Sequence, residues 1–390
     1  MSFSVKPFLV TTTRRSFLAV FLQSFLPTLG VLGLMVGGYF YLQYLDQLEK
    51  TKTYEIAKTE LGHRAIEQFI QRITADVRIL AESVNLQRLL QNPSLQSKSD
   101  LAHEFEAFSR YKAIYDQIRY FDETGMEVVR VNYAAGRALI VPEEQLQQKF
   151  GRYYFMDAFR LQRGQLYISP LDLNIENSVI QRPFKPMIRV GTPVFDQGGR
   201  KRGIVLVNYL ANEILQRFEL LTSSAEAQAF VINAEGYWIV AGDSAREWGF
   251  MLGHKQRFSE QYPDVLQQFL SSSVGQFAIA EDIFSWKTVY PLTSHAISSS
   301  GSIEPLGGST HSVHDHDYFW KVGTHVTSQT ISKWRERDMY SALTLFLLIA
   351  VLALIGNLFL ARSRLREQKN LHELESSERL LNIITSELAE

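Results

Sequence analysis

The sequence has no cysteine in its 390 residues. This absence excludes disulfide bonds, a thiolate nucleophile and cysteine-based metal sites. The sequence also lacks an excess of either charge, because 40 Lys and Arg residues face 41 Asp and Glu residues. Such a balance does not point to nucleic acid, so we expect no nucleic-acid partner. The length leaves room for about two to three domains.

Two stretches of the chain lack charged side chains altogether. The first has 30 residues (16–45) and the second has 23 (339–361). The hydrocarbon core of a bilayer needs about 20 apolar residues of helix, and both stretches exceed that length. Both are therefore predicted to be transmembrane helices. A cleaved signal peptide is the alternative for the first, although its apolar part exceeds the usual length of about 7–15 residues.

The basic residues next to these spans predict their orientation. They stand just before the first span and just after the second, at Lys6, Arg14, Arg15, Arg362, Arg364, Arg366 and Lys369. Because cytoplasmic flanks are enriched in Lys and Arg, we expect residues 1–15 and 362–390 in the cytoplasm. The chain is then a multi-pass protein of the inner (cytoplasmic) membrane, with residues 46–338 on the periplasmic or extracellular side.

After the first span, residues 46–92 are predicted to form one long helix that ends at Asn92-Pro93. Its apolar residues recur at alternating steps of four and three, at Ile66, Ile70, Ile73, Val77, Leu80 and Val84. Such a stripe fits packing against a sheet, and it also fits pairing with a second copy of the same helix. We favour packing against the domain, with part of the stripe available for dimerisation.

Three segments of the outer domain repeat one pattern, a strand followed by a turn and a second strand. The turns are Asp122–Gly125, Asp196–Gly199 and Asn233–Gly236. Asp or Asn opens each turn because its side chain accepts hydrogen bonds from backbone amides, and Gly closes it because it adopts a positive φ. The pattern predicts antiparallel hairpins, and the helices expected between them predict an α+β fold.

A predicted helix over residues 211–221 divides the outer domain into two lobes. Residues 93–221 are expected to form a lobe far from the membrane, and residues 222–338 a lobe close to it. The second lobe is predicted to contain a helix at 260–270, strands at 275–280, 285–291 and 319–326, and a polar insertion at 293–317.

Four segments of the first lobe carry a resemblance to a known family. They are Arg152–Phe155, Tyr167–Asn174 with Glu176, Pro183–Arg189, and Thr192–Asp196 followed by Gly203-Ile204. They resemble the double Cache family, the PAS-like extracytoplasmic sensors of bacterial histidine kinases, diguanylate cyclases and chemoreceptors. The resemblance implies two transmembrane helices flanking two PAS-like antiparallel-sheet lobes on a long N-terminal helix. It also implies a homodimeric signal-transduction sensor whose distal lobe binds a small molecule.

The first lobe also contains residues suited to binding an anion. Cations on predicted strands or strand edges stand near aromatic and polar residues, and the candidate ligand-binding set is Arg130, Arg152, Tyr153, Tyr154, Asp172, Asn174, Lys185 and Arg189. Arg grips a carboxylate through two hydrogen bonds, and Asp172 could hold the ammonium group of an amino acid. The predicted ligand is therefore a small carboxylate or an amino acid. The alternative is that these cations pair with carboxylates on the protein surface.

The polar insertion is rich in histidine, with His295, His311, His314 and His316 beside Asp315 and Asp317. Histidine and aspartate could ligate zinc or nickel. However, the surrounding Gly- and Ser-rich sequence is typical of a solvated loop, which does not preorganise ligands. We therefore expect neither a metal site nor a cofactor. The insertion is also unusually polar and long for a hairpin link. It departs from the resembled family, so no ligand site is carried over to the proximal lobe.

The residues after the second span predict a short coiled coil, with Leu371, Leu374, Leu381 and Leu388 at steps of three and seven. His372 lacks the neighbours of a kinase phosphoacceptor, and no cyclase or hydrolase signature occurs. No proline follows Pro305, which disfavours a HAMP module. We therefore expect no catalytic activity in this chain, and signalling through an output domain or a partner kinase or cyclase. A membrane-anchored periplasmic protein that recognises another protein is the alternative function.

Overall fold

The computed structural model describes residues 17–176, 179–263, 266–279, 281–292, 295–302, 308–314 and 316–387. The chain divides into two units. The first contains Met1–Lys50 with Ile331–Glu390, and the second contains Thr51–Thr330. Of the features predicted above, the N-terminal segment 1–15 and the residues Asp315 and Leu388 lie outside the described residues.

Two long helices, α1 (Phe17–Ala81) and α9 (Ser328–Glu387), contain the two charge-free stretches. Each has a segment long and apolar enough to cross a membrane. Large apolar side chains in these segments stand exposed, with Leu34 at 79% and Leu352 at 69%. A core helix of a soluble domain would bury such side chains, whereas a helix in lipid leaves them on its surface. The crossing itself and its orientation stay predictions.

The predicted helix over 46–92 is wrong in its second part. Helix α1 ends at Ala81, and a separate helix, α2 (Val84–Gln91), follows. The break occurs because Ser83 is extended and its Oγ accepts a hydrogen bond from the backbone N–H of Leu86, which starts a new helix.

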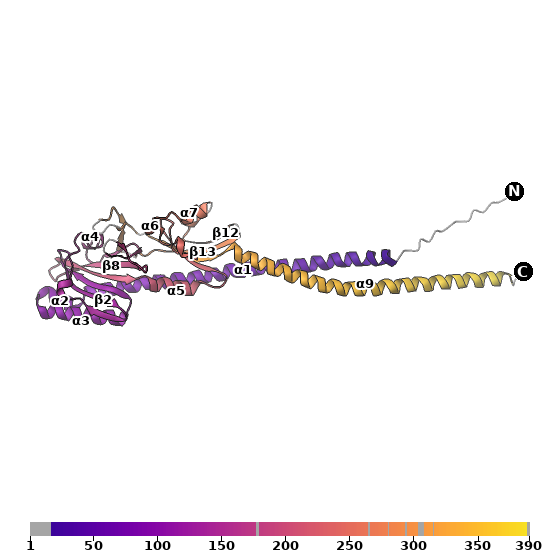
Figure 1. Cartoon of the computed structure of the whole chain (residues 1–390), viewed down its shortest axis with the longest axis horizontal. Helices are drawn as coiled ribbons and strands as arrows, with labels where there is room; N and C mark the ends of the chain where they lie inside the picture. Colours follow the sequence, from indigo (N-terminus) through magenta and orange to yellow (C-terminus); the bar gives the residue numbers. More distant parts are fainter. Residues whose placement is uncertain are drawn as a thin grey trace. The chain divides into compact units, whose positions relative to one another are not determined.

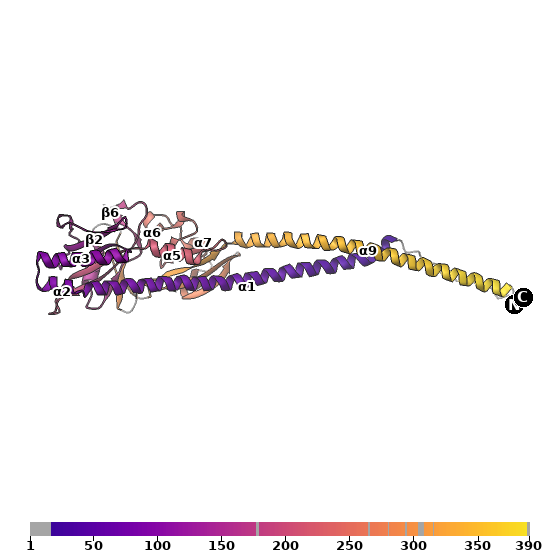
Figure 2. The same cartoon turned by 90° about the horizontal axis from the view of Figure 1, so that it is seen from below.

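A third helix, α3 (Leu95–Lys112), begins the distal lobe and was not predicted. Its capping box joins Ser94 and Ser97, each side chain accepting from the other's backbone N–H. The usual form of this box has Glu or Gln in the second position, so the serine pair was not recognised as a helix start. Helix α3 packs against α2 and β2, and Figure 2 shows α3 running beside α2.

The distal lobe is built on a nine-stranded sheet within the described residues, with the order β15-β14-β4-β8-β9-β1-β2-β3 and β5 paired to β8. The strands are β1 (Tyr115–Phe121), β2 (Glu127–Ala134), β3 (Arg137–Ile140), β4 (Leu166–Ile168), β5 (Asp172–Leu173), β8 (Pro186–Phe195), β9 (Lys201–Leu210), β14 (Ala296–Ser299) and β15 (Ser312–Val313). A separate pair, β6 (Ile175–Glu176) and β7 (Val179–Ile180), lies beside β5 in the chain. Helix α4 (Tyr153–Arg160) and the short 3₁₀ turn η1 (Glu143–Gln145) connect β3 to β4.

One face of the distal sheet packs on α1 (Figure 1). The predicted stripe supplies the helix side of this core, because Ile66, Ile70, Ile73, Val77 and Leu80 are all buried there. The stripe therefore packs on a sheet within the chain, as favoured from its spacing. Val84 does not take part, since it follows the helix break and is 73% exposed.

The three predicted hairpins are confirmed as the antiparallel pairs β1–β2, β8–β9 and β10–β11. Their turns have the expected chemistry. Asp122 Oδ1 accepts hydrogen bonds from the N–H groups of Thr124 and Met126, and Asn233 Oδ1 accepts from those of Glu235 and Tyr237. The closing residues all have positive φ, at Gly125, Gly199 and Gly236.

The proximal lobe is built on a five-stranded sheet of order β11-β10-β16-β13-β12. Its strands are β10 (Gln228–Asn233), β11 (Trp238–Val240), β12 (Val274–Ile279), β13 (Asp282–Val289) and β16 (Trp320–Val326), close to the predicted strands. The helix predicted at 260–270 is wrong, because two short helices, α7 (Phe258–Gln261) and α8 (Leu266–Ser271), stand there instead. Helix α5 (Asn212–Thr222) follows β9 as expected, and η2 (Ser244–Arg246) and α6 (Gly249–Leu252) complete the lobe. An aromatic cluster that includes Phe230, Phe258, Phe284 and Trp286 forms its core.

The polar insertion is not a solvated loop throughout its described residues, because residues 296–299 form the buried strand β14. Strand β14 pairs with β4 in parallel, with Ala296 opposite Leu166, and so extends the distal sheet. Ser299 Oγ lies 2.9 Å from the phenol oxygen of the buried Tyr167. The strand was not predicted because its buried residues include the polar Ser298 and Ser299, of which Ser299 is hydrogen-bonded to Tyr167.

Candidate functional site

A cavity of about 500 Å³ lies over the distal sheet, on the face opposite α1. Side chains of successive residues point to opposite faces of a strand, so the same strands line the cavity and pack on the helix. In β8, Arg189 lines the cavity while Ile188 and Val190 belong to the core with α1. In β1, Arg119 lines it while Ile118 belongs to that core.

Strand register aligns the floor of the cavity. Gln117 of β1 stands opposite Asn132 of β2 and Asn208 of β9, and Asn208 stands opposite Arg189 of β8. A row of polar side chains therefore crosses four neighbouring strands. All four residues line the cavity.

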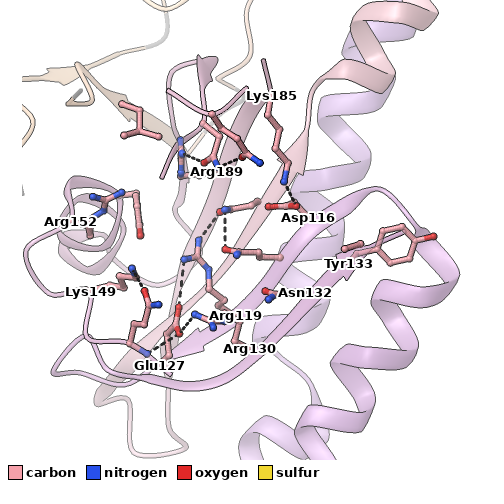
Figure 3. A pocket seen from close by; sticks show the side chains of 18 residues that line it. Asp116, Arg119, Glu127, Arg130, Asn132, Tyr133, Lys149, Arg152, Lys185 and Arg189 are labelled. Atoms are coloured by element: carbon pink, nitrogen blue, oxygen red, sulfur yellow. Dashed lines mark hydrogen bonds and ion pairs between the residues drawn. The ribbon is translucent and has the colours of Figure 1, made fainter. Parts of the chain in front are cut away.

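Six of the eight predicted site residues line this cavity, namely Arg130, Arg152, Tyr154, Asn174, Lys185 and Arg189. The other two, Tyr153 and Asp172, are not among its lining residues and instead contact Arg189. Arg152 and the two tyrosines do not lie on strands, because Arg152 precedes helix α4 and the tyrosines begin it. Figure 3 shows Arg152 and Lys149 facing the strand residues Arg119 and Arg130 across the site.

Arg189 is held by a buried network. Its Nη1 lies 2.9 Å from Asp172 Oδ1 and donates at 3.2 Å to the phenol oxygen of Tyr153. Its Nη2 donates to Asn174 Oδ1 at 3.3 Å, and its backbone N–H donates to Ser169 Oγ at 2.9 Å. Burial raises the pKa of Asp172, and Arg189 opposes that rise. The ion pair therefore explains how both charges are tolerated in the interior.

This arrangement corrects one expectation for the site. Asp172 was expected to offer its carboxylate to the ammonium group of a ligand. In the structure that carboxylate is occupied by Arg189 and by the O–H of Tyr153, which donates to Asp172 Oδ2 at 3.1 Å. Part of the alternative, that the cations pair with the protein's own carboxylates, therefore holds for Arg189, although the pair is buried rather than on the surface.

A second network joins Arg119, Glu127 and Arg130. The Glu127 side chain is fully buried and lies between the two guanidinium groups, 2.8 Å from Arg130 Nη1 and 3.7 Å from Arg119 Nη1. Arg119 Nη2 also donates to Asn208 Oδ1 at 2.6 Å. Arg119 Nε, Arg130 Nε and Asn132 Oδ1 are buried without a hydrogen-bond partner among the described residues.

Other residues that line the cavity were not among the predicted site residues, namely Asp116, Arg119, Glu127, Asn132, Lys149 and Asn208. Lys185 Nζ lies 2.6 Å from Asp116 Oδ1, and Lys149 Nζ donates to Gln147 Oε1. The available signal was strand alternation, because residues 117 and 119 are polar while 118 and 120 join the core. Apart from Arg130, the predicted residues come from the resembled motifs, which lie in other segments.

Tyr154 stands at the centre of the cationic side chains. The guanidinium carbons of Arg119, Arg152 and Arg189 lie 5.4, 5.7 and 5.6 Å from the centroid of its ring, a cation–π distance. Burial by itself raises the pKa of the Tyr154 phenol, but these cations and Lys149 outweigh burial and lower that pKa below 10. The cations around this ring therefore favour the ionised form of its phenol.

The described residues hold no group of three or more His, Cys, Asp or Glu side chains arranged to hold a metal ion. The described histidines of the polar insertion therefore belong to no such group. Chemically, the cavity offers guanidinium and ammonium donors, amide groups, two carboxylates and two tyrosine side chains, and few apolar surfaces.

Comparisons with known proteins place the fold. The sequence matches the family described as bacterial histidine kinase, sensor domain, over residues 53–298. A search of curated proteins finds no match. Among solved structures, a domain described as of the sensory box/GGDEF family from Vibrio parahaemolyticus is 19% identical with a TM-score of 0.58. The similarity covers 73% of this chain and 98% of the Vibrio domain.

Two further structures are similar. The extracellular domain described as that of histidine kinase vpHK1S-Z8 is 20% identical with a TM-score of 0.59, and covers 74% of this chain and 98% of its own. The ligand-binding domain of the Pseudomonas aeruginosa PAO1 amino-acid chemoreceptor PctC, in complex with GABA, is 13% identical with a TM-score of 0.44. It covers 71% of this chain and 100% of its own. The matched domains are sensor domains rather than catalytic domains. With its family match over residues 53–298 and its two lobes on a long helix, the chain belongs to the bacterial histidine kinase sensor domains, in keeping with the double Cache resemblance.

Proposed function

We propose that this chain is the sensing and membrane-anchoring part of a signal-transduction protein of the histidine kinase or diguanylate cyclase type. Its distal lobe binds a small ligand that carries a carboxylate group, in the cavity lined by Arg119, Arg130, Arg152 and Arg189. Binding biases a displacement of the long helices, which a homodimer passes across the membrane to an output domain or partner.

The observation that carries this proposal is the position of the cavity relative to α1. The cavity and the helix lie on opposite faces of the same strands. Along each strand, residues that line the cavity therefore alternate with residues that pack on α1. Tyr209 on β9 packs on Phe69 of α1 with ring centroids 4.2 Å apart, while the neighbouring Asn208 lines the cavity. A ligand that tightens the strands therefore alters the packing of the helix through one layer of side chains.

Ligand binding is tested with the full chain in lipid nanodiscs, by thermal shift against a panel of carboxylates and amino acids. A ligand that binds only the folded state raises the unfolding temperature in a concentration-dependent way. Arg189→Ala is expected to remove the shift. Arg160→Ala is the matched control, because Arg160 is an exposed arginine of α4 outside the cavity lining. If no member of the panel stabilises the protein, the ligand assignment is wrong.

Transmission is tested with spin labels, since the absence of native cysteine makes any introduced cysteine unique. Tyr54 on α1 is 60% exposed and suits labelling as Tyr54→Cys. In a homodimer, double electron–electron resonance measures the distance between the two spin labels. The distribution of this distance is expected to change when ligand is added. A single label without a partner signal would contradict the homodimer, and an unchanged distribution would contradict the helix displacement.

A further inference from the structure

The cavity of the distal lobe has an excess of positive charge. Six cationic side chains line it, namely Arg119, Arg130, Lys149, Arg152, Lys185 and Arg189. Three carboxylates face them: Asp116 and Glu127 line the cavity, and Asp172 lies against Arg189. At neutral pH this leaves a formal excess of three positive charges around a space of about 500 Å³. Water screens such charges poorly inside a protein, so the excess favours an anionic occupant.

All three carboxylates are already paired. Lys185 lies 2.6 Å from Asp116, Arg130 lies 2.8 Å from Glu127, and Arg189 lies 2.9 Å from Asp172. A ligand ammonium group would have to compete with these cations for a carboxylate. It would also stand among six groups of its own charge, which is unfavourable.

The donors of the site remain partly unused. Arg119 Nε and Arg130 Nε are buried N–H groups without a hydrogen-bond partner in the part of the chain that the structure describes. A buried donor left unpaired is costly, and an anionic oxygen is its strongest partner. Asn132 Oδ1 is a buried acceptor that likewise has no hydrogen-bond partner among the described residues, and a ligand hydroxyl could donate to it.

The lining also disfavours an apolar side chain. Ala134 and Ile175 are the aliphatic members of the lining, and the remainder are charged, amide-bearing or tyrosine residues. Sites for apolar amino acids present hydrophobic walls, because the side chain gains its affinity from burial.

We propose that the ligand of this cavity is a compact polyanion with at least two carboxylate or phosphate groups, rather than a zwitterionic amino acid. This inference rests on the proposed function and narrows its ligand class. Charge matching supports it: two or three anionic groups neutralise the excess, whereas a zwitterion leaves it unchanged.

Calorimetric titration of the full chain in nanodiscs tests the ligand class with three four-carbon probes that differ in one group. Butyrate carries one carboxylate, 4-aminobutyrate adds an ammonium group, and succinate adds a second carboxylate. Succinate is expected to bind about tenfold tighter than either, since each added anionic group interacts with the excess charge. Tricarballylate and pyrophosphate extend the series. Tighter binding of the first identifies carboxylates as the source of the anionic groups, and tighter binding of the second identifies phosphates.

The outcomes separate the two proposals. If 4-aminobutyrate or another zwitterionic amino acid binds tighter than every polyanion, the polyanion inference is overturned while the proposed sensor function stands. If neither these probes nor the wider panel of carboxylates and amino acids binds, the proposed function itself fails.

A matched pair of variants tests the role of the charge. Lys149→Gln removes one positive charge from the lining without stranding a carboxylate, because Lys149 bonds to Gln147. It is expected to weaken succinate binding about fivefold to tenfold and butyrate binding less. Lys255→Gln removes the same charge from an exposed position outside the cavity and is expected to change neither affinity. Equal losses with both variants, or no loss with Lys149→Gln, would overturn the inference.

Discussion

Replacing Arg189 with methionine is expected to destabilise the distal lobe in a strongly pH-dependent way. Methionine replaces the aliphatic part of the arginine side chain but removes the cation that neutralises Asp172, whose side chain is 17% exposed. Removing one partner of a buried ion pair usually costs about 3–5 kcal/mol. In this case the cost has an upper limit, because the stranded carboxyl group can take up a proton.

That limit sets the magnitude at each pH. Protonating a carboxyl with an unfolded-state pKa near 3.9 costs about 4 kcal/mol at pH 7 and about 1.5 kcal/mol at pH 5. Burial already raises the pKa of Asp172 in the folded protein, and loss of Arg189 raises it further. The folded variant then binds a proton that the unfolded chain releases, so its stability increases as pH falls from about 7 towards 5.

Asp172→Asn and the double variant complete a double-mutant cycle with Arg189→Met and the wild type. Asp172→Asn strands the guanidinium of Arg189, which cannot lose its proton, so its cost of about 3 kcal/mol is expected to be independent of pH. The double variant strands neither charge and is expected to lose only about 1 kcal/mol. Urea unfolding at pH 5, 6 and 7, followed by far-UV circular dichroism, measures all four proteins. A loss in Arg189→Met that is the same at pH 5 and pH 7 would refute the reasoning.

Three predictions concern the proximal lobe. Gly323→Ala places a Cβ about 2.0 Å from the backbone oxygen of Ser285. Urea unfolding is therefore expected to show a loss of about 3 kcal/mol in the free energy of unfolding. An unchanged unfolding midpoint would contradict the close packing of β13 and β16. Phe258→Ala empties a fully buried aromatic position and is expected to cost about 3–5 kcal/mol by the same measurement, whereas a cost below about 1 kcal/mol would show that the cluster collapses around it. Burial raises the pKa of Asp282, but its contact with His325 and the Ser328 N–H outweigh burial and lower the pKa to about 2. The stabilisation from this carboxylate is therefore present above about pH 4 and lost as pH falls through 2. The difference in stability between wild type and Asp282→Asn should shrink over that range. A constant difference would contradict the lowered pKa of Asp282.

Local sequence patterns predict only part of the candidate site. The alternation of Ile118 and Arg119, or of Arg189 and Val190, is visible in the sequence and assigns side chains to two faces of a sheet. The partners across strands are not visible, because they depend on register between distant segments. Arg119 bonds to Asn208 across 89 positions, and Lys185 pairs with Asp116 across 69. For this reason the meeting of Arg119, Glu127 and Lys149 at one cavity was not predicted.

Some features of this protein follow from the sequence alone. The charge-free stretches place two long apolar helices because hydrophobic length is a local property. The Asp or Asn and Gly residues of the three turns determine the hairpins, since side-chain hydrogen bonds and positive φ act within four residues. The apolar steps of four and three from Ile66 to Leu80 determine which face of α1 is buried.

Other features were decided only by the tertiary structure. Strand β14 joins the distal sheet beside β4, and its Ser299 meets Tyr167 across 132 positions of sequence. Asp172 pairs with Arg189 instead of remaining available to a ligand, because their strands are neighbours in the folded sheet. In both cases the outcome depends on which backbones lie side by side and on which polar groups are buried together. Such contacts carry no local periodic signal, because non-local pairing is selected by packing and by the cost of burying unpaired polar groups.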